Sequence, residues 1–564
     1  MGQHRNRTTK AAHRYLATLV AGAALVGSMF AASASATPQS DNADAQRNAA
    51  LVKSGPMTPE KAALLGKSNL DFGPNCDTTT GRVKIPTVYA PPCIQPFTGK
   101  NGGATAQGVT DNEIKVVVYV GDPSKDPVLA GQLIAAGAGL DPNTIKATWQ
   151  GYIDIFNKTL ELYGRKISVE FFDGTGSGAD TAAAKADAIA IADKKPFAVL
   201  AGPGQATSVF SDELAHRGVL CLGTCAAVVP QKIVTSNQGY IFTDGASPEQ
   251  AAQIAAELIG KQAGPGKAQY AGDNATKNKN RVYGVAHYDT PDGLYHSQFN
   301  ALKDGLEKYK ITPKVEQSFF LDPAKIQENA RTIITKMKDA GVTTIIYTGD
   351  PLTPAALTKE ATAQDYHPEW IIGPTVGVDS TLLGRTYDQD QWAHAFGVAL
   401  LPGRVPQSEN PNYALYTWFH DAPPPNNTYN AITPSVSLLV SGITMAGPKL
   451  TPKTFRDGLF RYPPSGGDPI DPQQSWGKHA VWPFVDYWGS DDAGMLWWDP
   501  NATGEDEVGK AGQGLYQYAD GAKRYTFGHL PARGQGGLFN TGTAVTVFPQ
   551  LPPESTTPTY TPPG

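Results

Sequence analysis

The chain has few cysteines, little net charge and no long apolar run beyond its first segment. It carries 4 cysteines in 564 residues and a formal net charge of −5. This balance argues against a nucleic-acid partner, because such proteins usually show a basic excess. After residue 36, no apolar stretch approaches the roughly 20 residues of a membrane-spanning helix. We therefore expect membrane contact only through a partner protein.

Metal and cofactor motifs are also missing. The 10 histidines show no His-Glu-x-x-His motif and no paired ligand spacing. The Cys-x-x-x-Cys pair at 221 and 225 has no second pair at zinc-ligand spacing. On these grounds the sequence predicts no metal site and no cofactor.

A glycine turn at 202–204, within "AVLAGPGQATSVFSDEL", lacks the residues of a nucleotide or catalytic site. It has no lysine where a phosphate-binding loop needs one, and no third glycine for a dinucleotide fingerprint. No Gly-x-Ser-x-Gly nucleophile turn occurs near the predicted strand ends. Because we find no nucleophile–base–orienter set, we do not expect an enzyme, although an exported enzyme using the same turn remains an alternative.

The N-terminal segment has the pattern of an export signal. Four basic residues precede the apolar run "YLATLVAGAALVGSMFAA", and Ala34-Ser35-Ala36 follows it as a cleavage site. We expect residues 1–36 to be removed; retention as an anchor helix is the alternative. No cysteine follows the run to take a lipid anchor, so the protein is predicted to be secreted or free in the cell envelope.

The even cysteine count in an exported chain predicts two disulfides. Pairing between near neighbours joins Cys76 to Cys93 and Cys221 to Cys225. The other two pairings remain open on the sequence.

From Gly108 onwards, strand-like runs alternate with helix-like runs, which predicts parallel sheets wrapped by helices. A helix start at Ser247, with a capping box, separates two such α/β units. The expected divisions follow the chain: a loosely ordered extension at 37–107, a first lobe at 108–244, a second lobe at 245–400, a return segment completing both lobes and the hinge at 401–548, and a disordered Pro/Thr-rich tail at 549–564.

Several stretches resemble a known family in this order. "GVTDNEIKV" and "YGRKISVEFFDGTG" are similar to its first two strands, and "FAVLAGPGQATS" and "RGVLCLGTCAA" to its first-lobe ligand loops. The family is the type I periplasmic binding proteins, of the branched-chain amino-acid kind, and the last part of the chain resembles actinobacterial members. The resemblance implies two doubly wound α/β lobes joined by a hinge, with the ligand in a cleft between them.

Ligands of open parallel sheets lie beyond the carboxyl ends of the strands, so the residues there are the candidate ligand contacts. The glycines would allow close backbone approach, and a free helix N-terminus after the first turn suits an anion. The alternative is that these residues are ordinary turns and helix caps. The candidates are Tyr119, Asp122, Gly202, Gly204, Gln205, Thr207, Ser208, Gly223, Thr224 and Cys225 in the first lobe, and Tyr288, Asp289, Asp292, Tyr347 and Asp350 in the second.

The resemblance therefore implies a monomeric solute-binding protein that delivers a small amino-acid-like, amide or organic-acid ligand to an ABC permease of the branched-chain amino-acid type. A sensor or scavenger of the same fold, without a transporter, is the alternative. Neither the ligand nor the permease follows from the sequence.

Overall fold

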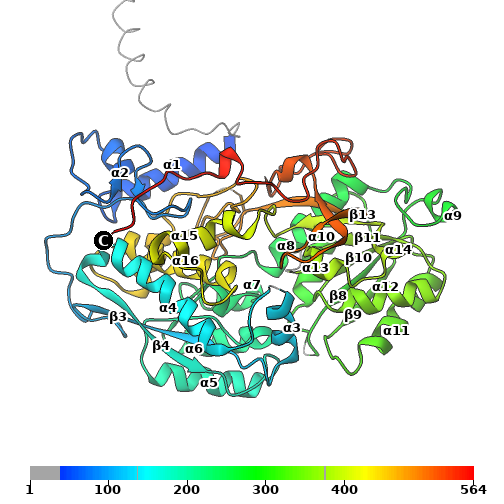
Figure 1. The fold of residues 1–564 in the computed structure, drawn as a ribbon, viewed down its shortest axis with the longest axis horizontal. Coiled ribbons are helices and arrows are strands. Elements are labelled where there is room, and N and C mark those ends of the chain that lie inside the picture. Colours follow the sequence, from blue (N-terminus) through cyan, green and yellow to red (C-terminus); the bar gives the residue numbers. More distant parts are fainter. Residues whose placement is uncertain (1–37, 136, 292, 374–376, 480, 564) are drawn as a thin grey trace, which may run out of the picture.

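The computed structural model describes residues 38–563 except 136, 292, 374–376 and 480. The expected export signal and Asp292 lie outside the described residues. Two α/β lobes lie side by side, each built on its own sheet (Figure 1). No helix in the described part of the chain has both the length and the apolar character to cross a membrane.

The first sheet has 5 parallel strands in the order β4–β3–β5–β6–β7. Most of their side chains are buried, as in sheets covered by helices on both faces. The strands are β3 (Glu113–Val120), β4 (Lys166–Asp173), β5 (Ala198–Leu200), β6 (Leu220–Leu222) and β7 (Ile241–Phe242). The helices of this lobe are α3 (Pro127–Ala135), α4 (Pro142–Thr159), α5 (Thr181–Asp193), α6 (Thr207–His216) and α7 (Gln231–Ser236).

The second sheet has 8 strands, of which β9, β8, β10, β11 and β12 are parallel neighbours. Its strands are β8 (Tyr283–Tyr288), β9 (Val315–Phe319), β10 (Thr344–Thr348), β11 (Glu369–Ile372), β12 (Ala395–Ala399), β13 (Asp492–Glu505), β14 (Ala511–Tyr518) and β15 (Tyr525–Thr526). Its helices are α8 (Pro248–Leu258), α9 (Asn274–Lys277), α10 (His296–Glu307), α11 (Ile326–Asp339), α12 (Thr353–Ala363), α13 (Thr381–Gly384) and α14 (Gln389–Trp392). The strands β13, β14 and β15 join it antiparallel, so the lobe is a mixed sheet rather than a purely parallel one.

The chain passes between the lobes three times. It leaves the first lobe after β7, returns after β12, and leaves again after helices α15 (Pro411–His420), α16 (Tyr429–Ala446) and α17 (Pro452–Leu459). The first and third passages run together: Thr243 N–H donates to Tyr487 O, and Trp476 Nε1 donates to Thr243 O. This pairing forms the hinge.

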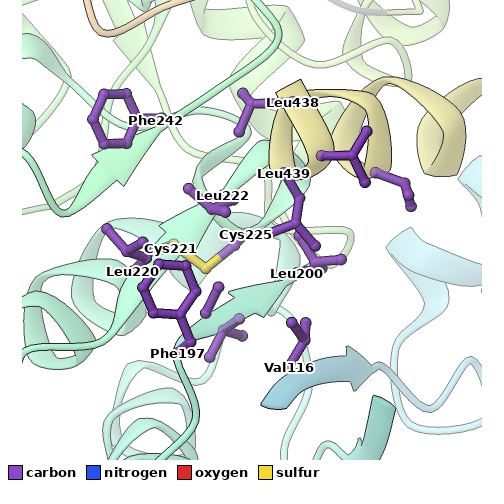
Figure 2. Packing of buried hydrophobic residues seen from close by; sticks show 14 of the residues in the cluster. Val116, Phe197, Leu200, Leu220, Cys221, Leu222, Cys225, Phe242, Leu438 and Leu439 are labelled. Atoms are coloured by element: carbon purple, nitrogen blue, oxygen red, sulfur yellow. A yellow bond between two sulfur atoms is a disulfide. The ribbon is translucent and has the colours of Figure 1, made fainter. Parts of the chain in front are cut away.

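Helix α16 completes the core of the first lobe although it follows strands β8 to β12 of the second lobe in sequence. Figure 2 shows its Leu438 and Leu439 beside Leu222 and the Cys221–Cys225 disulfide, which is fully buried in the same apolar cluster. Both near-neighbour disulfides are present, Cys76–Cys93 being the other. The first lobe is therefore closed by a helix from outside its own segment.

The terminal segments differ from expectation. The extension, expected to be loosely ordered, contains α1 (Pro38–Lys53), α2 (Pro59–Leu64) and a short hairpin of β1 (Cys76–Asp77) and β2 (Arg82–Val83). The tail, expected to be disordered, is held by side-chain bonds: Trp418 Nε1 donates to Tyr560 O at 2.7 Å, and the Tyr560 hydroxyl donates to Asp77 at 2.8 Å. Specific polar contacts to distant elements order both segments, and composition alone does not reveal such contacts.

The buried carboxyl of Asp486 makes stability depend on pH. It accepts hydrogen bonds from Trp488 N–H and from Gln250 Nε2 across the hinge, and desolvation raises its pKa to about 8. Since an unfolded Asp titrates near pH ~4, the folded state holds an extra proton between those two values. The stabilisation is therefore complete below about pH 4 and is lost as pH rises through 8.

We expect the free energy of unfolding to fall by up to about 1.4 kcal/mol for each pH unit between pH ~5 and ~8. Urea unfolding at several pH values measures this slope, and Asp486→Asn should reduce it. An Asp365→Asn variant, at a side chain that is 97% exposed, is the control for the charge change. An unchanged slope in Asp486→Asn would show that this carboxyl is ionised in the fold.

Candidate functional site

The two predicted loops of the first lobe lie against each other. A Cβ added at Gly202 would lie 2.9 Å from the Cys225 carbonyl oxygen and 3.2 Å from Thr207 Cγ2. The glycine therefore allows the turn after β5 to contact the turn after β6. Gly204 has φ +50° and lies against Gly178, whose carbonyl accepts the Ala206 N–H. Backbone packing thus accounts for both glycines, and Gln205 sits half-buried between them and α6.

A short polar chain links the second loop to the hinge. The Thr224 N–H donates to Ser435 Oγ at 3.1 Å, and that hydroxyl donates to Asp244 Oδ2 at 3.2 Å. Gly223, with φ +62°, makes this possible, because a Cβ there would lie 2.2 Å from Ser435 Oγ. Desolvation raises the pKa of the half-buried Asp244 carboxyl to about 6, partly offset by the Ser435 hydrogen bond.

Thr207 stands out among the predicted residues. It is 1% exposed, and its hydroxyl has no hydrogen-bond partner among the described residues. It begins α6, which carries no side-chain cap at its N-terminus. A buried hydroxyl without a partner costs free energy, so it is a position where a ligand group would restore a lost hydrogen bond.

The predicted residues of the second lobe hold their own loops. The Asp350 carboxylate accepts the N–H groups of Leu352 and Thr353 at the start of α12. The Tyr347 hydroxyl donates to the Asp350 carbonyl oxygen, and its ring stacks on Phe319. These contacts are the helix-capping and core roles that the sequence left open as an alternative.

The segment after β8 is organised in the same way. Asp289 Oδ1 accepts the N–H groups of Thr290 and Tyr295, so it closes the turn between β8 and α10. The Tyr288 ring packs edge-on against Tyr295 and Phe319. As ligand contacts, these residues remain predictions.

Tyr119 and Asp122 lie at the end of β3 but serve the first lobe itself. Tyr119 is 3% exposed, its hydroxyl donates to Asp187, and its ring packs on Phe172 and Phe210. Asp122 accepts hydrogen bonds from the N–H and the hydroxyl of Ser124, which lower its pKa. All of these contacts lie within the first lobe.

Direct contacts across the lobes centre on Tyr295, the residue before α10. Its hydroxyl donates to the Val228 carbonyl oxygen at 2.8 Å, and Ser208 Oγ lies 3.3 Å from the same hydroxyl. Near it, the Gln231 N–H donates to the Glu249 carboxylate at 3.1 Å. Periodicity could not show that Tyr295 spans the lobes, since this depends on how the lobes meet.

A polar hollow of about 300 Å³ lies between α7 of the first lobe and α8 and α10 of the second. None of the predicted residues lines it. Its lining includes Gln231, Glu249, Ser297, Asp304 and Lys308. The hollow is thus separate from the paired loops around Thr207 and Thr224.

Two α/β lobes are joined by three passages, and the segment after β8 of one meets the segment after β6 of the other. This arrangement is typical of proteins that enclose a ligand between domains. Residues 143–472 match the family model described as periplasmic binding protein. This match spans more than half of the 564 residues, so the chain belongs to the periplasmic binding protein family.

No curated protein sequence matches the chain. Similar solved structures include the branched-chain amino acid transporter substrate binding protein LivJ from Streptococcus pneumoniae, in complex with isoleucine, at 15% identity and a TM-score of 0.47, covering 72% of this chain and 100% of that one. Another is a solute binding protein of an ABC transporter from Rhodopseudomonas palustris, in complex with p-hydroxybenzoic acid, at 13% identity and a TM-score of 0.49, covering 74% and 98%.

The tight contact between Gly223 and α16 gives a direct test of this architecture. We expect Gly223→Ala to lower the free energy of unfolding by about 3 kcal/mol, because the new methyl group would overlap Ser435 and occupy a left-handed conformation. Denaturant titration measures the change.

Gly218→Ala is the matched control. Gly218 has φ +73° but nothing within 4 Å of an added Cβ, so only the conformational cost of about 1 kcal/mol applies. Equal losses in the two variants would contradict the steric role of Ser435.

Proposed function

We propose that the protein is the solute-binding component of an ABC importer, and that it holds a small carboxylate ligand of the amino-acid or organic-acid type between its lobes. The observation that carries this proposal is the buried, unpartnered hydroxyl of Thr207 at the uncapped start of α6. Family membership supports the binding role.

A carboxylate suits the start of α6 for two reasons. The first N–H groups of a helix lack partners inside the helix and lie at the positive end of its dipole, which favours an anion. The Thr207 hydroxyl would add a donor from the same turn. Thr224 lies on the turn after β6, which adjoins Gly202, and its N–H leads through Ser435 of α16 to Asp244 after β7.

Asp244 supplies the same region with a carboxylate, which attracts a cation rather than an anion. Its carboxyl has a pKa of about 6, so it is largely ionised at neutral pH and would attract a ligand ammonium group. An amino acid carries both a carboxylate and an ammonium group, whereas an organic acid would use only the α6 side. The amide class expected from the sequence fits the Thr207 and Thr224 donors without either charge.

Closure of the lobes would be stabilised by Tyr295, whose hydroxyl bonds the second lobe to Val228 in the first. A ligand that contacts both lobes favours the closed state only by its differential affinity for that state. A preformed interlobe hydrogen bond therefore adds to the apparent affinity.

The proposal places the protein outside the cytoplasm. Two disulfides are formed among its 4 cysteines, and such bonds persist in oxidising compartments. The expected export signal at 1–36 agrees with this location. The permease partner is then a membrane protein that recognises the closed lobes.

Thr207→Val tests the ligand site, because it should raise the free energy of unfolding and lower the affinity for ligand. In the ligand-free protein we expect the free energy of unfolding to rise by about 1 kcal/mol, because a buried hydroxyl without a partner is removed. Affinity for any carboxylate found by a thermal-shift screen of amino acids, aromatic acids and amides should fall about tenfold, measured by calorimetry.

Thr148→Val is the matched control, since Thr148 is fully buried but its hydroxyl donates to Thr144 O at 2.8 Å. That variant should lose stability and keep the ligand affinity. A screen without any carboxylate hit, or a hit whose affinity Thr207→Val leaves unchanged, would overturn the proposed site.

Tyr295→Phe tests the closure argument. Removing one interlobe hydrogen bond, worth about 0.5–1.5 kcal/mol, should weaken ligand binding by up to about tenfold. Calorimetry with the screened ligand measures the effect.

Tyr283→Phe provides the comparison, because its hydroxyl donates to the Gly264 carbonyl oxygen at 2.6 Å within the second lobe. It should reduce stability without changing affinity. Equal affinity changes in the two variants would show that the Tyr295 bond does not report on closure.

A further inference from the structure

Two imidazoles and a carboxylate meet beside the loop that joins β8 to α10. They are His287 at the end of β8, His296 at the start of α10 and Glu316 in β9, and their nearest ligand atoms all lie within 4.8 Å of one another. His287 Nε2 lies 3.2 Å from Glu316 Oε1, and His296 Nδ1 lies 3.9 Å from the same oxygen. The carboxylate of Asp289 flanks the group, with Oδ2 3.5 Å from His296 Nδ1.

We propose that these residues form a binding site for a divalent transition metal, with Zn²⁺ as the fitting ion. Neutral imidazole nitrogens and carboxylate oxygens are the donors that Zn²⁺ takes in proteins. A Ca²⁺ or Mg²⁺ site would instead be built from oxygen ligands.

The spacing of the donors matches a tetrahedral ion. Ligands at the usual Zn–N and Zn–O distances of about 2.1 Å stand about 3.4 Å apart at the corners of a tetrahedron. Among the three donors, the distances from Glu316 Oε1 to His287 Nε2 and to His296 Nδ1, 3.2 and 3.9 Å, lie close to that value, and the three nearest ligand atoms all lie within 4.8 Å of one another. His287, His296 and Glu316 would therefore supply three corners of the tetrahedron, and a water molecule would take the fourth.

Outer hydrogen bonds already orient two of the donors. His287 Nδ1 lies 3.3 Å from the Tyr288 carbonyl oxygen, which can only accept a hydrogen bond, so the tautomer with its proton on Nδ1 would leave the Nε2 lone pair for a metal. Asp289 Oδ1 is engaged by the N–H groups of Thr290 and Tyr295, which leaves Oδ2 toward His296. Residues that hydrogen-bond to metal ligands commonly orient the ligands in this way.

The environment allows an ion to enter and to be held. The His287 side chain is fully buried and its ring stacks on Phe299, with centroids 4.8 Å apart. His296 and Glu316 have side chains that are 48% and 40% exposed, so the outer side of the group is open to solvent. The Glu316 carboxylate in the group and the Asp289 carboxylate beside it would balance the charge of a divalent ion held by two neutral imidazoles.

Sequence spacing could not reveal this group, since its members stand at 287, 296 and 316 on three elements. The metal would tie both ends of the segment from His287 to His296, and Tyr295, which bonds the first lobe, belongs to that segment. Metal binding would therefore fix the loop that makes the interlobe contact.

Calorimetry with ZnCl₂ on tag-free, chelator-treated protein tests the site. We expect one equivalent to bind saturably, and Co²⁺ to give the visible absorption of a tetrahedral complex at the same stoichiometry. His296→Ala and Glu316→Gln, both at exposed side chains, should each weaken binding at least about tenfold.

His216→Ala is the matched control: this α6 histidine is 66% exposed and pairs only with Asp212, at 3.6 Å, so its loss should leave the affinity unchanged. Excess Mg²⁺ should not displace the ion. Absence of saturable Zn²⁺ binding, or equal weakening in all three variants, would show that the group is a hydrogen-bonded cluster only and overturn the proposal.

Discussion

The contact between Gly223 and Ser435 is the constraint on which the rest of the structure depends. It allows α16, which follows strands β8 to β12 of the second lobe in sequence, to lie directly on the loop after β6 and complete the first core. Without a side chain at Gly223, the serine hydroxyl can join the Thr224 backbone to Asp244 at the hinge. Lobe packing, loop shape and the first interlobe passage are therefore coupled at one point, and the first lobe cannot form its full core before the chain has returned from the second.

The two lobes hold their facing loops by different means. In the first, a buried disulfide and backbone contacts fix the paired turns, so their shape is set when the lobe folds. In the second, single carboxylates such as Asp289 and Asp350 cap short turns through two or more hydrogen bonds each. Such hydrogen bonds open more easily than a covalent bond breaks. The loops of the first lobe are thus constrained more tightly than those of the second.

The sequence predicted the α/β class, both near-neighbour disulfides and the position of the helix start at Ser247, because periodicity, cysteine count and capping chemistry are local. It did not predict that residues 38–64 and the tail are ordered, since those segments are held by single contacts such as Tyr560 to Asp77. The predicted carboxyl ends of the strands indicated candidate ligand contacts, but two of these, Tyr119 and Tyr347, are buried within their own lobes. Which side of a strand end faces a cleft depends on the packing of two lobes, and no local pattern encodes it.

The difference in how the two lobes hold their loops indicates which lobe would bind a ligand first. The proposed anion site at the start of α6 would need little further ordering when it is filled, whereas the β8–α10 segment must keep its turn and place Tyr295 against Val228 at the same time. Ordering costs are lower on the rigid side. Binding would therefore begin on the first lobe, and the second would follow by closing on it. A metal bound at the proposed site would stiffen the segment between His287 and His296 and so lower the remaining free-energy cost of closure. The proposed metal site and ligand site would then be linked through this one loop rather than through a change in either lobe.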